Sequence, residues 1–376
     1  MAVEFTPSAG PTVGIEWEIG LVDAESMDLV PAAEVVFDAL RDDNGDLDPH
    51  IHPELQRNTV ELVTGVCDTV GQAIEELKGA LAAVHSVTDP LGIEVFSAGS
   101  HPFAHSHEQE TTPDERYDLL LDRTQYWGRQ MLIYGVHVHV GIDSSAKAMP
   151  LINGLLPYNP HLLALSASSP FWGGVDTGYA SHRSLIFQQL PTAGLPFHFD
   201  TWQEYERYVD DLFTTGVITV LKEVRWDIRP SPGFGTIENR ICDGVSSIAE
   251  MEALGALTHC LVIDLSDRLD AGESLPNLPP WHAQENKWRA ARYGLEAEII
   301  LDAANSERLV TDDVMDLLER LDPVARRLGC ASELASVETI IRQGAGYQRQ
   351  RRVFADSDDP RAVVADLVAQ LKKSLL

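Results

Sequence analysis

Two glutamates on the segment 14–20 (GIEWEIG) have residue types and a spacing that suit chemistry. Apolar and acidic residues alternate in this segment, and side chains on a β-strand alternate between the two faces of a sheet. We therefore expect Glu16 and Glu18 side by side on one face, opposite the apolar side chains. Two adjacent carboxylates repel each other unless a cation lies between them. The pair is either an ordinary solvent-facing surface or one part of a metal site.

The same alternation of polar and apolar residues recurs on four later segments that we predict as strands. These segments are 59–63 (TVELV), 136–141 (VHVHVG), 224–229 (VRWDIR) and 236–241 (TIENRI). Their polar faces would present Glu61, His137, His139, Arg225, Asp227, Arg229, Glu238 and Arg240. A solvent-facing strand seldom carries two histidines between valines, so this segment indicates function more strongly than the others do.

Carboxylates combined with one or two imidazoles are ligands that suit Mg²⁺ or Mn²⁺. Arginines beside them suit phosphate groups, which they bind through paired hydrogen bonds. Any antiparallel sheet with one wet face also alternates, however, and Glu238 with Arg240 is by default a salt bridge along a strand. The functional interpretation therefore requires that these strands be neighbours, and strand order does not follow from the sequence.

The elements that must position these residues alternate along the chain. We predict strands at 12–22, 59–66, 93–98, 136–142, 224–229 and 236–242. We predict helices at 31–41, 71–89, 114–133, 150–166 and 248–269. The helix 150–166 is expected to be broken at Pro157 and Pro160. The turn 230–235 (PSPGFG) predicts a hairpin between the last two strands. The pattern favours a half-wet, partly antiparallel sheet with helices on its other face. We expect a single catalytic domain over 1–376, in which 281–376, after the proline-rich stretch 276–280, is a mainly helical portion packed on the rest.

The composition limits the possible partners. The chain has 376 residues, and its 28 Lys and Arg against 58 Asp and Glu give a net charge of -30. Such a surface repels nucleic acid and anionic membranes, so we expect small-molecule substrates. The four cysteines form no CxxC pair, and the sequence has no signal peptide and no run of eighteen apolar residues, which together predict a cytoplasmic protein. A homodimer is expected only because symmetric dimers are common.

These residues lie in segments that resemble the bacterial carboxylate-amine ligases of the type 2 glutamate-cysteine ligase family, including its YbdK-like branch. The matching segments follow in order over most of the chain: 14–18 (GIEWE), 61–64 (ELVT), 99–103 (GSHPF), 135–141 (GVHVHVG), 226–232 (WDIRPSP), 235–240 (GTIENR) and 292–296 (RYGLE). The resemblance implies an α+β, glutamine-synthetase-like catalytic fold, in which a curved, mainly antiparallel sheet forms a funnel with helices on its outer face. It also implies ATP-dependent amide-bond formation through an acyl phosphate, with ATP and Mg²⁺ or Mn²⁺ as cofactors.

The resemblance also implies roles for single residues. Arg240 would contact the transferred phosphoryl group, Arg229 would bind phosphate or the acid substrate, and Arg292 would bind the nucleotide. Arg289 shares a helix face with Arg292 but is equally consistent with a solvated surface. Glu54, seven residues before Glu61, has the spacing of a further acidic ligand although its local match is poor. The implied metal ligands are Glu16, Glu18, Glu61 and Glu238 with His137 or His139, of which His137 has the closer sequence context.

Two other functions remain open at this stage. A metal-dependent hydrolase would use the same carboxylates and histidines around an activated water. The absence of His-Glu-x-x-His argues against its zinc form, and a peptidase would not need the arginines. A non-catalytic ligand-binding homologue is the second alternative. Glutamate and cysteine are the substrates that the family implies, but no residue can be assigned to the thiol, and members of the YbdK-like branch can be poor at the cysteine reaction.

Overall fold

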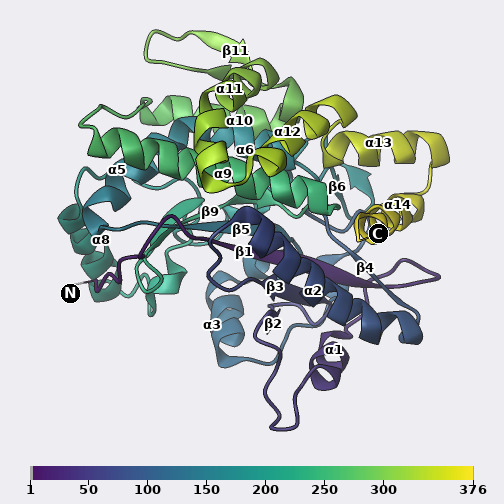
Figure 1. Cartoon of the computed structure of the whole chain (residues 1–376). Coiled ribbons are helices and arrows are strands. Elements are labelled where there is room, and N and C mark those ends of the chain that lie inside the picture. The colour runs from purple at the N-terminus through teal and green to yellow at the C-terminus, as the bar shows by residue number, and fades with distance from the viewer. Residues whose placement is uncertain (1–2, 376) are drawn as a thin grey trace.

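A seven-stranded antiparallel sheet forms the centre of the molecule, and the computed structural model describes residues 3–375 (Figure 1). Its strands are β1 (Val13–Asp23), β2 (Ile51–Pro53), β3 (Thr59–Val63), β4 (Ile93–Phe96), β5 (Gly135–Gly141), β8 (Ile228–Ser231) and β9 (Thr236–Asp243). The strand order is β2-β3-β1-β5-β9-β8, and β4 pairs with the second half of β1. The predicted α+β fold class with a mainly antiparallel sheet is confirmed.

The strand register places the predicted polar residues opposite one another. Glu16 pairs with His137, Glu18 pairs with Glu61, and His139 pairs with Glu238. Residues that pair directly across neighbouring strands project to the same face of the sheet. The condition left open by the sequence, that these strands be neighbours, is therefore met.

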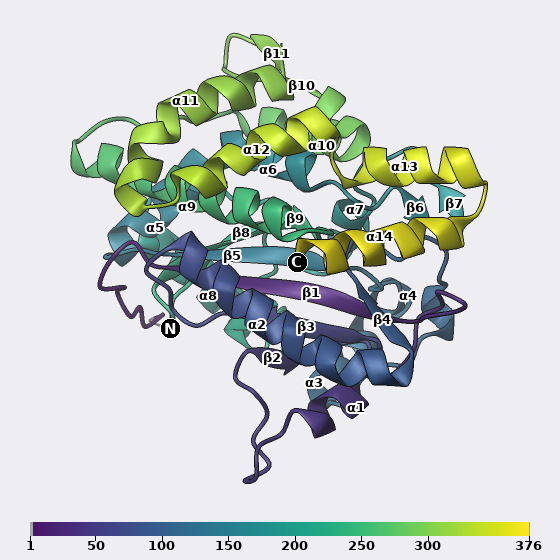
Figure 2. The same ribbon diagram turned by 45° about the vertical axis from the view of Figure 1, so that its right-hand side comes forward.

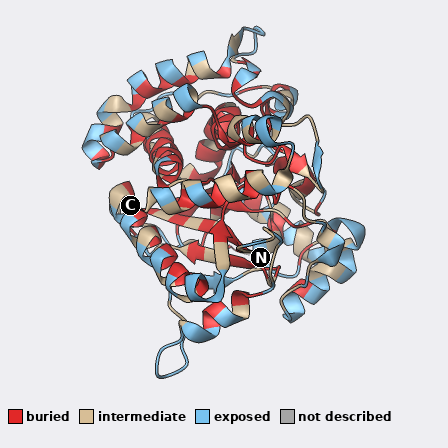
Figure 3. Ribbon diagram, turned by 90° about the vertical axis from the view of Figure 1, so that its right-hand side faces the viewer, coloured by how far each residue is buried: buried red, intermediate tan, exposed pale blue. Residues whose placement is uncertain are grey.

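Helices cover the apolar face of the sheet in two layers (Figure 2). The layer on the sheet contains α2 (Val70–Thr88), α5 (Ser145–Leu155), α6 (Asn159–Ser166), α9 (Ile248–Asp270) and α14 (Pro360–Ser374). The layer outside it contains α10 (Pro280–Tyr293), α11 (Val310–Leu328) and α12 (Ala331–Gln343). Buried residues fill the sheet and the helices nearest to it (Figure 3), and Ile15 and Trp17 point into this core with at most 1% of their surface exposed.

Local sequence signals begin the two long helices of the inner layer. The side chain of Thr69 accepts a hydrogen bond from the backbone N–H of Gln72, and Ser247 does the same for Glu250, so both helices have an N-cap. Gly255 lets α9 approach β1 closely, because a Cβ there would lie 3.1 Å from the Cδ1 atom of Ile15. The sheet is thus held firmly from its apolar side, which leaves the polar face available for a site.

The remaining elements lie around this framework. They are α1 (Ala33–Ala39), α3 (Glu115–Thr124), α4 (Tyr126–Arg129), α7 (Arg183–Phe187), α8 (Trp202–Thr214), α13 (Gly346–Ser357), the hairpins β6 (Phe171–Trp172) with β7 (Val175–Asp176) and β10 (Glu298–Ile300) with β11 (Glu307–Leu309), and the 3₁₀ turns η1 (Asp89–Leu91), η2 (Ser106–Glu108), η3 (Leu156–Tyr158), η4 (Leu221–Glu223) and η5 (Gly294–Glu296). The expected break of the helix 150–166 is η3. No helix within 3–375 is long and apolar enough to cross a bilayer.

Two predicted elements differ from the structure. The expected helix 114–133 is divided into α3 and α4, because Gln125 adopts a φ of 49° that a continuous helix does not allow. The expected strand 224–229 begins only at Ile228. Before that point the N–H groups of the chain bond to the loop at 192–194, since Arg225 N–H donates to Thr192 and Asp227 N–H donates to Gly194. The link to β9 there is the hydrogen bond that the Asp227 carbonyl accepts from the Arg240 N–H.

Asp227 consequently does not share the polar face predicted for it. Its carboxylate accepts a 2.7 Å hydrogen bond from Lys287 on α10, and both side chains are buried. A buried charge of this kind is retained because it is paired. The portion 281–376 is mainly helical, although it also contains the β10–β11 hairpin. Its description as part of a single domain stays a prediction.

Candidate active site

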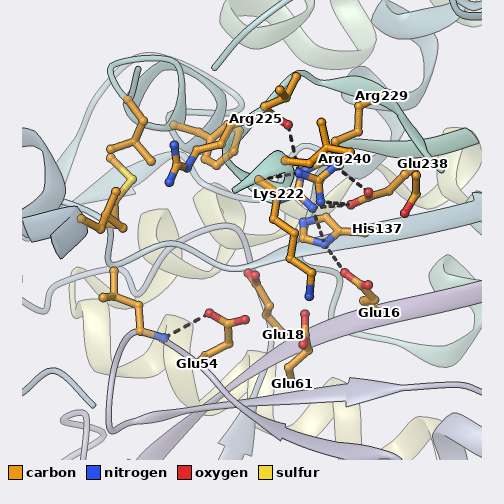
Figure 4. A pocket seen from close by; sticks show the side chains of 18 of the residues that line it. Glu16, Glu18, Glu54, Glu61, His137, Lys222, Arg225, Arg229, Glu238 and Arg240 are labelled. Atoms are coloured by element: carbon orange, nitrogen blue, oxygen red, sulfur yellow. Dashed lines mark hydrogen bonds and ion pairs between the residues drawn. The ribbon is translucent and has the colours of Figure 1, made fainter. Parts of the chain in front are cut away.

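A cavity of about 500 Å³ lies on the polar face of the sheet, and the six carboxylate and histidine positions favoured by the sequence all line it. This volume is within the range of small-molecule sites. The strands contribute its polar wall (Figure 4). Further lining residues come from α3, α7 and η4. The polar lining residues that the argument uses are Glu16, Glu18, Glu54, Glu61, Arg116, His137, His139, Arg183, Lys222, Arg225, Arg229, Glu238 and Arg240.

One group of possible metal ligands joins three strands, and we call it group one: Glu16, His137 and Glu238. One donor atom from each lies within 4.8 Å of the others. Glu16 accepts a 2.7 Å hydrogen bond from Nδ1 of His137 and a 3.1 Å hydrogen bond from Nε2 of His139. Burial acts to raise the pKa of Glu16, but these two histidines outweigh it and hold that pKa well below its usual range. Glu16 is therefore ionised at neutral pH.

The two histidines of β5 differ in whether a ring nitrogen remains free to bind a ligand. Nδ1 of His139 lies 2.9 Å from the Thr236 hydroxyl and Nε2 contacts Glu16, so both nitrogens are engaged. An ionised carboxylate only accepts, so Nδ1 of His137 carries the proton toward Glu16 and Nε2 keeps a lone pair. Burial, followed by the charge of Arg240, lowers the pKa of His137 to about 4, whereas Glu238 and Glu16 outweigh burial and raise the pKa of His139. His137 is thus the neutral imidazole that a metal requires.

A second group, which we call group two, contains only carboxylates: Glu18, Glu54 and Glu61. Donor atoms from all three lie within 4.8 Å of one another. Burial and the charge of Glu54 raise the pKa of Glu18 to about 8, and burial with three neighbouring glutamates raises the pKa of Glu61 well above its ordinary value. Such crowding without a cation is unfavourable unless protons or a metal compensate it. Glu54, the weakest assignment from the sequence, lies in this group.

The two strand arginines play unequal parts. The guanidinium of Arg229 is bound to protein partners. Its Nε and Nη2 donate to Glu238 at 2.6 and 3.1 Å, and its Nη1 donates to the carbonyls of Lys222 and Val224 at 2.9 Å. Arg240 donates to Glu238 through Nη1, and its Nε is buried without a partner among the described residues. Burial acts to raise the pKa of Glu238, but these guanidinium groups outweigh it and hold the pKa far below the usual range. Of these two strand arginines, Arg240 is the one that can still bind a ligand.

The structure does not bring Arg292 to this cavity. Arg292 donates to the carbonyl of Gly178 and lies over the rings of Tyr179 and Tyr293. Arg289 is paired with Glu285 and Glu307 on the outer side of α10. The assignment of Arg292 to the nucleotide stays a prediction that its position does not support.

Three cationic lining residues were absent from the sequence-based set. Arg116 lies at the start of α3, Arg183 at the start of α7 and Lys222 in η4. None of the three lies on a strand, so the alternation of polar and apolar residues could not predict them. The only signal is the position of Arg183 next to His182 in a polar segment, and that signal is too common to be useful.

Solved structures show which fold this chain shares. A glutamate-cysteine ligase from Francisella tularensis, in complex with AMP, aligns with a TM-score of 0.65 at 16% identity and covers 99% of this chain and 94% of that one. A bifunctional glutathione synthetase from Pasteurella multocida aligns with a TM-score of 0.70 at 15% identity, covering 97% of this chain and 52% of that one. The fold is that of the glutamine-synthetase-like ligases.

Sequence comparison identifies the family. The model of the glutamate-cysteine ligase family 2 matches residues 12–366. A protein of Arthrobacter sp. (strain FB24) named "Putative glutamate--cysteine ligase 2-1" is 59% identical over 378 residues and covers 99% of both chains. A relative from Mycobacterium ulcerans (strain Agy99), "Putative glutamate--cysteine ligase 2", is 60% identical over 370 residues, covering 98% of this chain and 93% of its own. The chain belongs to the glutamate-cysteine ligase family 2 and is an ATP-dependent ligase, which decides against the hydrolase and the non-catalytic homologue.

Proposed function

We propose that this cavity joins the carboxylate of one amino acid to the amine of another, with glutamate and cysteine as the substrate pair, and that ATP supplies the driving force. The observation that carries the proposal is the placement of groups one and two on one cavity wall with Arg240 beside them. The names of the relatives supply the substrate pair, and the AMP complex of the Francisella enzyme supports a nucleotide in the same fold.

The donor sets fit divalent cations, and this fit can be judged from the structure. Burial raises the pKa of each of the three carboxylates in group two, and the charges of neighbouring glutamates raise it further. Group one combines two carboxylates with a neutral imidazole. Oxygen-rich sets of this kind suit Mg²⁺ or Mn²⁺, which would neutralise charge on the phosphates of ATP. Glu16, His137 and Glu238 would hold one ion, and Glu18, Glu54 and Glu61 a second.

The reaction needs an activated carboxylate, because a carboxylate oxygen is a poor leaving group. A carboxylate oxygen of the acid substrate attacks the γ-phosphorus of ATP, the bond to the ADP oxygen breaks, and an acyl phosphate forms. The amine then attacks the acyl carbon, inorganic phosphate leaves with the bridging oxygen, and the amine loses one proton. Phosphoryl transfer depends mainly on positioning and on neutralising charge on the phosphoryl oxygens.

The chain supplies that positioning through a rigid support. Arg240 has N–H groups available for the phosphoryl oxygens, and Arg229 holds Glu238 and the η4 backbone in place. Charge-assisted hydrogen bonds from a guanidinium are strong and directional, which suits an ion whose charge is spread over three oxygens. Arg229 is therefore a positioning residue, whereas the sequence predicted it to bind a ligand directly.

Incubation of the protein with ATP, Mg²⁺, glutamate and cysteine tests the proposal. We expect release of one ADP for each γ-glutamylcysteine formed, and no product when ATP is omitted. Replacing cysteine by other amino acids in parallel reactions identifies the preferred amine. Amide product formed without ATP, or ATP hydrolysis to AMP, would contradict the proposed reaction.

Comparison of His137→Asn with His139→Asn tests the assignment of group one. We expect His137→Asn to weaken Mn²⁺ binding at least about 10-fold more than His139→Asn does, because only His137 keeps a nitrogen lone pair free. Titration of Mn²⁺ followed by electron paramagnetic resonance gives both affinities. A larger loss in the His139 variant would assign the ligand role to His139.

A further inference from the structure

Arg183 is a buried guanidinium that borders the cavity and leaves much of its hydrogen-bonding capacity unused. The residue begins α7, and only 3% of its surface is exposed. Its Nε has no partner among the described residues. Nη1 and Nη2 reach only the carbonyls of Arg240 and Ile241 at 3.4 to 3.5 Å, at the outer limit of a hydrogen bond. A guanidinium has five N–H groups, and burying them unpaired is costly.

The nearest carboxylate balances this charge without engaging it fully. Asp243 Oδ1 lies 3.9 Å from Nη1 of Arg183. The Asp243 carboxylate already accepts hydrogen bonds from the Ser168 N–H at 3.0 Å, the Ser169 hydroxyl at 2.7 Å and the Ser181 hydroxyl at 2.8 Å. Asp243 therefore anchors Arg183 electrostatically but leaves its N–H groups available to another acceptor.

Gly135 allows the guanidinium to lie beside group two. A Cβ atom at position 135 would come within 2.0 Å of Nη2 of Arg183, so only glycine leaves room for the arginine there. The N–H of the same glycine donates to Glu18 at 2.5 Å. One backbone position thus places a cation and a carboxylate of group two next to each other.

Apolar side chains line the cavity beside Arg183. Ile186 on α7 is buried in a cluster with Leu55, Met131 and Leu190, against which Phe187 packs. All of these except Ile186 border the cavity. The guanidinium groups of Arg183 and Arg240 each lie 5.9 Å from the centre of the Phe187 ring. Apolar side chains of this kind suit the methylene groups of a short aliphatic chain.

We propose that Arg183 binds the non-reacting carboxylate of an amino-acid substrate, while the apolar wall of α7 and its neighbours holds the aliphatic chain. This inference rests on the proposed function and deepens it. Arg240, beside group one, binds the phosphoryl group. Arg183, beside group two, binds the amino acid. A free carboxylate occurs on both the acid and the amine substrate, and the experiment distinguishes these two sources.

The test compares Arg183→Gln with the wild-type protein on matched substrate pairs. The acid arm uses glutamate and 4-aminobutyrate, which lacks the α-carboxylate, and the amine arm uses cysteine and cysteamine, which lacks its carboxylate. We expect Arg183→Gln to lower kcat/KM with glutamate and cysteine by about 10- to 100-fold, the effect of a lost hydrogen bond to a charged group. One of the two analogues, 4-aminobutyrate or cysteamine, lacks the carboxylate that Arg183 binds. With that analogue, the variant and the wild type should react at equal rates. Arg183→Lys, which keeps the charge but not the paired geometry, should fall between them.

Equal losses with all substrates, or a loss confined to the KM for ATP, would overturn the inference and leave Arg183 a structural or phosphate-binding residue. Calorimetric titration of glutamate and cysteine into both proteins gives the same comparison without turnover. If the wild type releases no ADP with any amino acid, the proposed function fails. The calorimetric difference between the wild type and Arg183→Gln still decides whether Arg183 binds a carboxylate.

Discussion

Replacing Glu238 by glutamine is expected to lower the rate of amide formation by about 100- to 1000-fold, the range seen when one group that stabilises a transition state is removed. Glutamine keeps the shape of the side chain but loses the charge that orients Arg229 and Arg240 and completes group one. The side chain is only 1% exposed, so the variant also leaves two guanidinium groups without their buried partner. We expect the free energy of unfolding to fall by about 3 to 5 kcal/mol.

Steady-state ADP release and urea denaturation measure the two effects of Glu238→Gln separately. Glu94→Gln is a matched control, because Glu94 lies on β4 of the same sheet, pairs with Lys372 at 2.5 Å and does not line the cavity. Its activity should stay within about two-fold of the wild type, as for most substitutions away from a site. Unchanged activity in Glu238→Gln would show that group one does not take part in the reaction.

Without divalent cations, the protein is expected to become less stable as the pH rises from about 6.5 to 8. Burial and Glu54 raise the pKa of Glu18 from 4.5 to about 8, and the pKa of Glu61 is raised in the same direction. In this window the unfolded chain has already lost the protons that the folded chain keeps. The free energy of unfolding therefore falls, by roughly 1 kcal/mol per pH unit for each such group. Below about pH 6.5 the lowered pKa values of His101 and His137 act in the opposite sense, whereas above it the raised pKa of His139 acts in the same sense as those of Glu18 and Glu61.

Cation binding should remove this pH dependence. A divalent ion on group two displaces the protons of Glu18 and Glu61, so its affinity should rise with pH over the same window. Melting temperatures recorded from pH 6.5 to 8 with EDTA and with Mn²⁺ measure both effects, and Glu18→Gln should reduce the slope seen in EDTA. A flat profile in EDTA for the wild type would show that the carboxylates of group two are ionised without a metal.

The metal-ligand candidates on strands could be predicted because they obey a two-residue period. Glu16, Glu18, Glu61 and His137 lie on regular antiparallel strands, so alternation alone placed them on the correct face. Glu54 follows β2 in a loop, and only its spacing from Glu61 suggested a role. For the strand residues the alternation predicted the face, whereas the register between strands supplied the neighbours.

The remaining parts of the site depend on tertiary structure that has no local signal. β9 carries a bulge opposite His137, where it has two residues, Arg240 and Ile241, against one on β5, and no residue pattern predicts it. Asp227 left the polar face because Lys287, sixty residues later, offers it a buried partner. Arg183, on α7, has room beside the cavity because Gly135 on β5 has no side chain. Arg292 matched a family segment, yet its helix turns it toward Tyr179 and Tyr293.

The most direct test of the central claim follows the oxygen atoms of the acid substrate. Glutamate labelled with ¹⁸O in its side-chain carboxylate is incubated with ATP, Mg²⁺ and cysteine, and the products are analysed by mass spectrometry. An acyl phosphate transfers one labelled oxygen to inorganic phosphate for each amide bond formed, and this is the result we predict. Labelled AMP, or inorganic phosphate without label, would contradict activation of the carboxylate by the γ-phosphoryl group in this cavity.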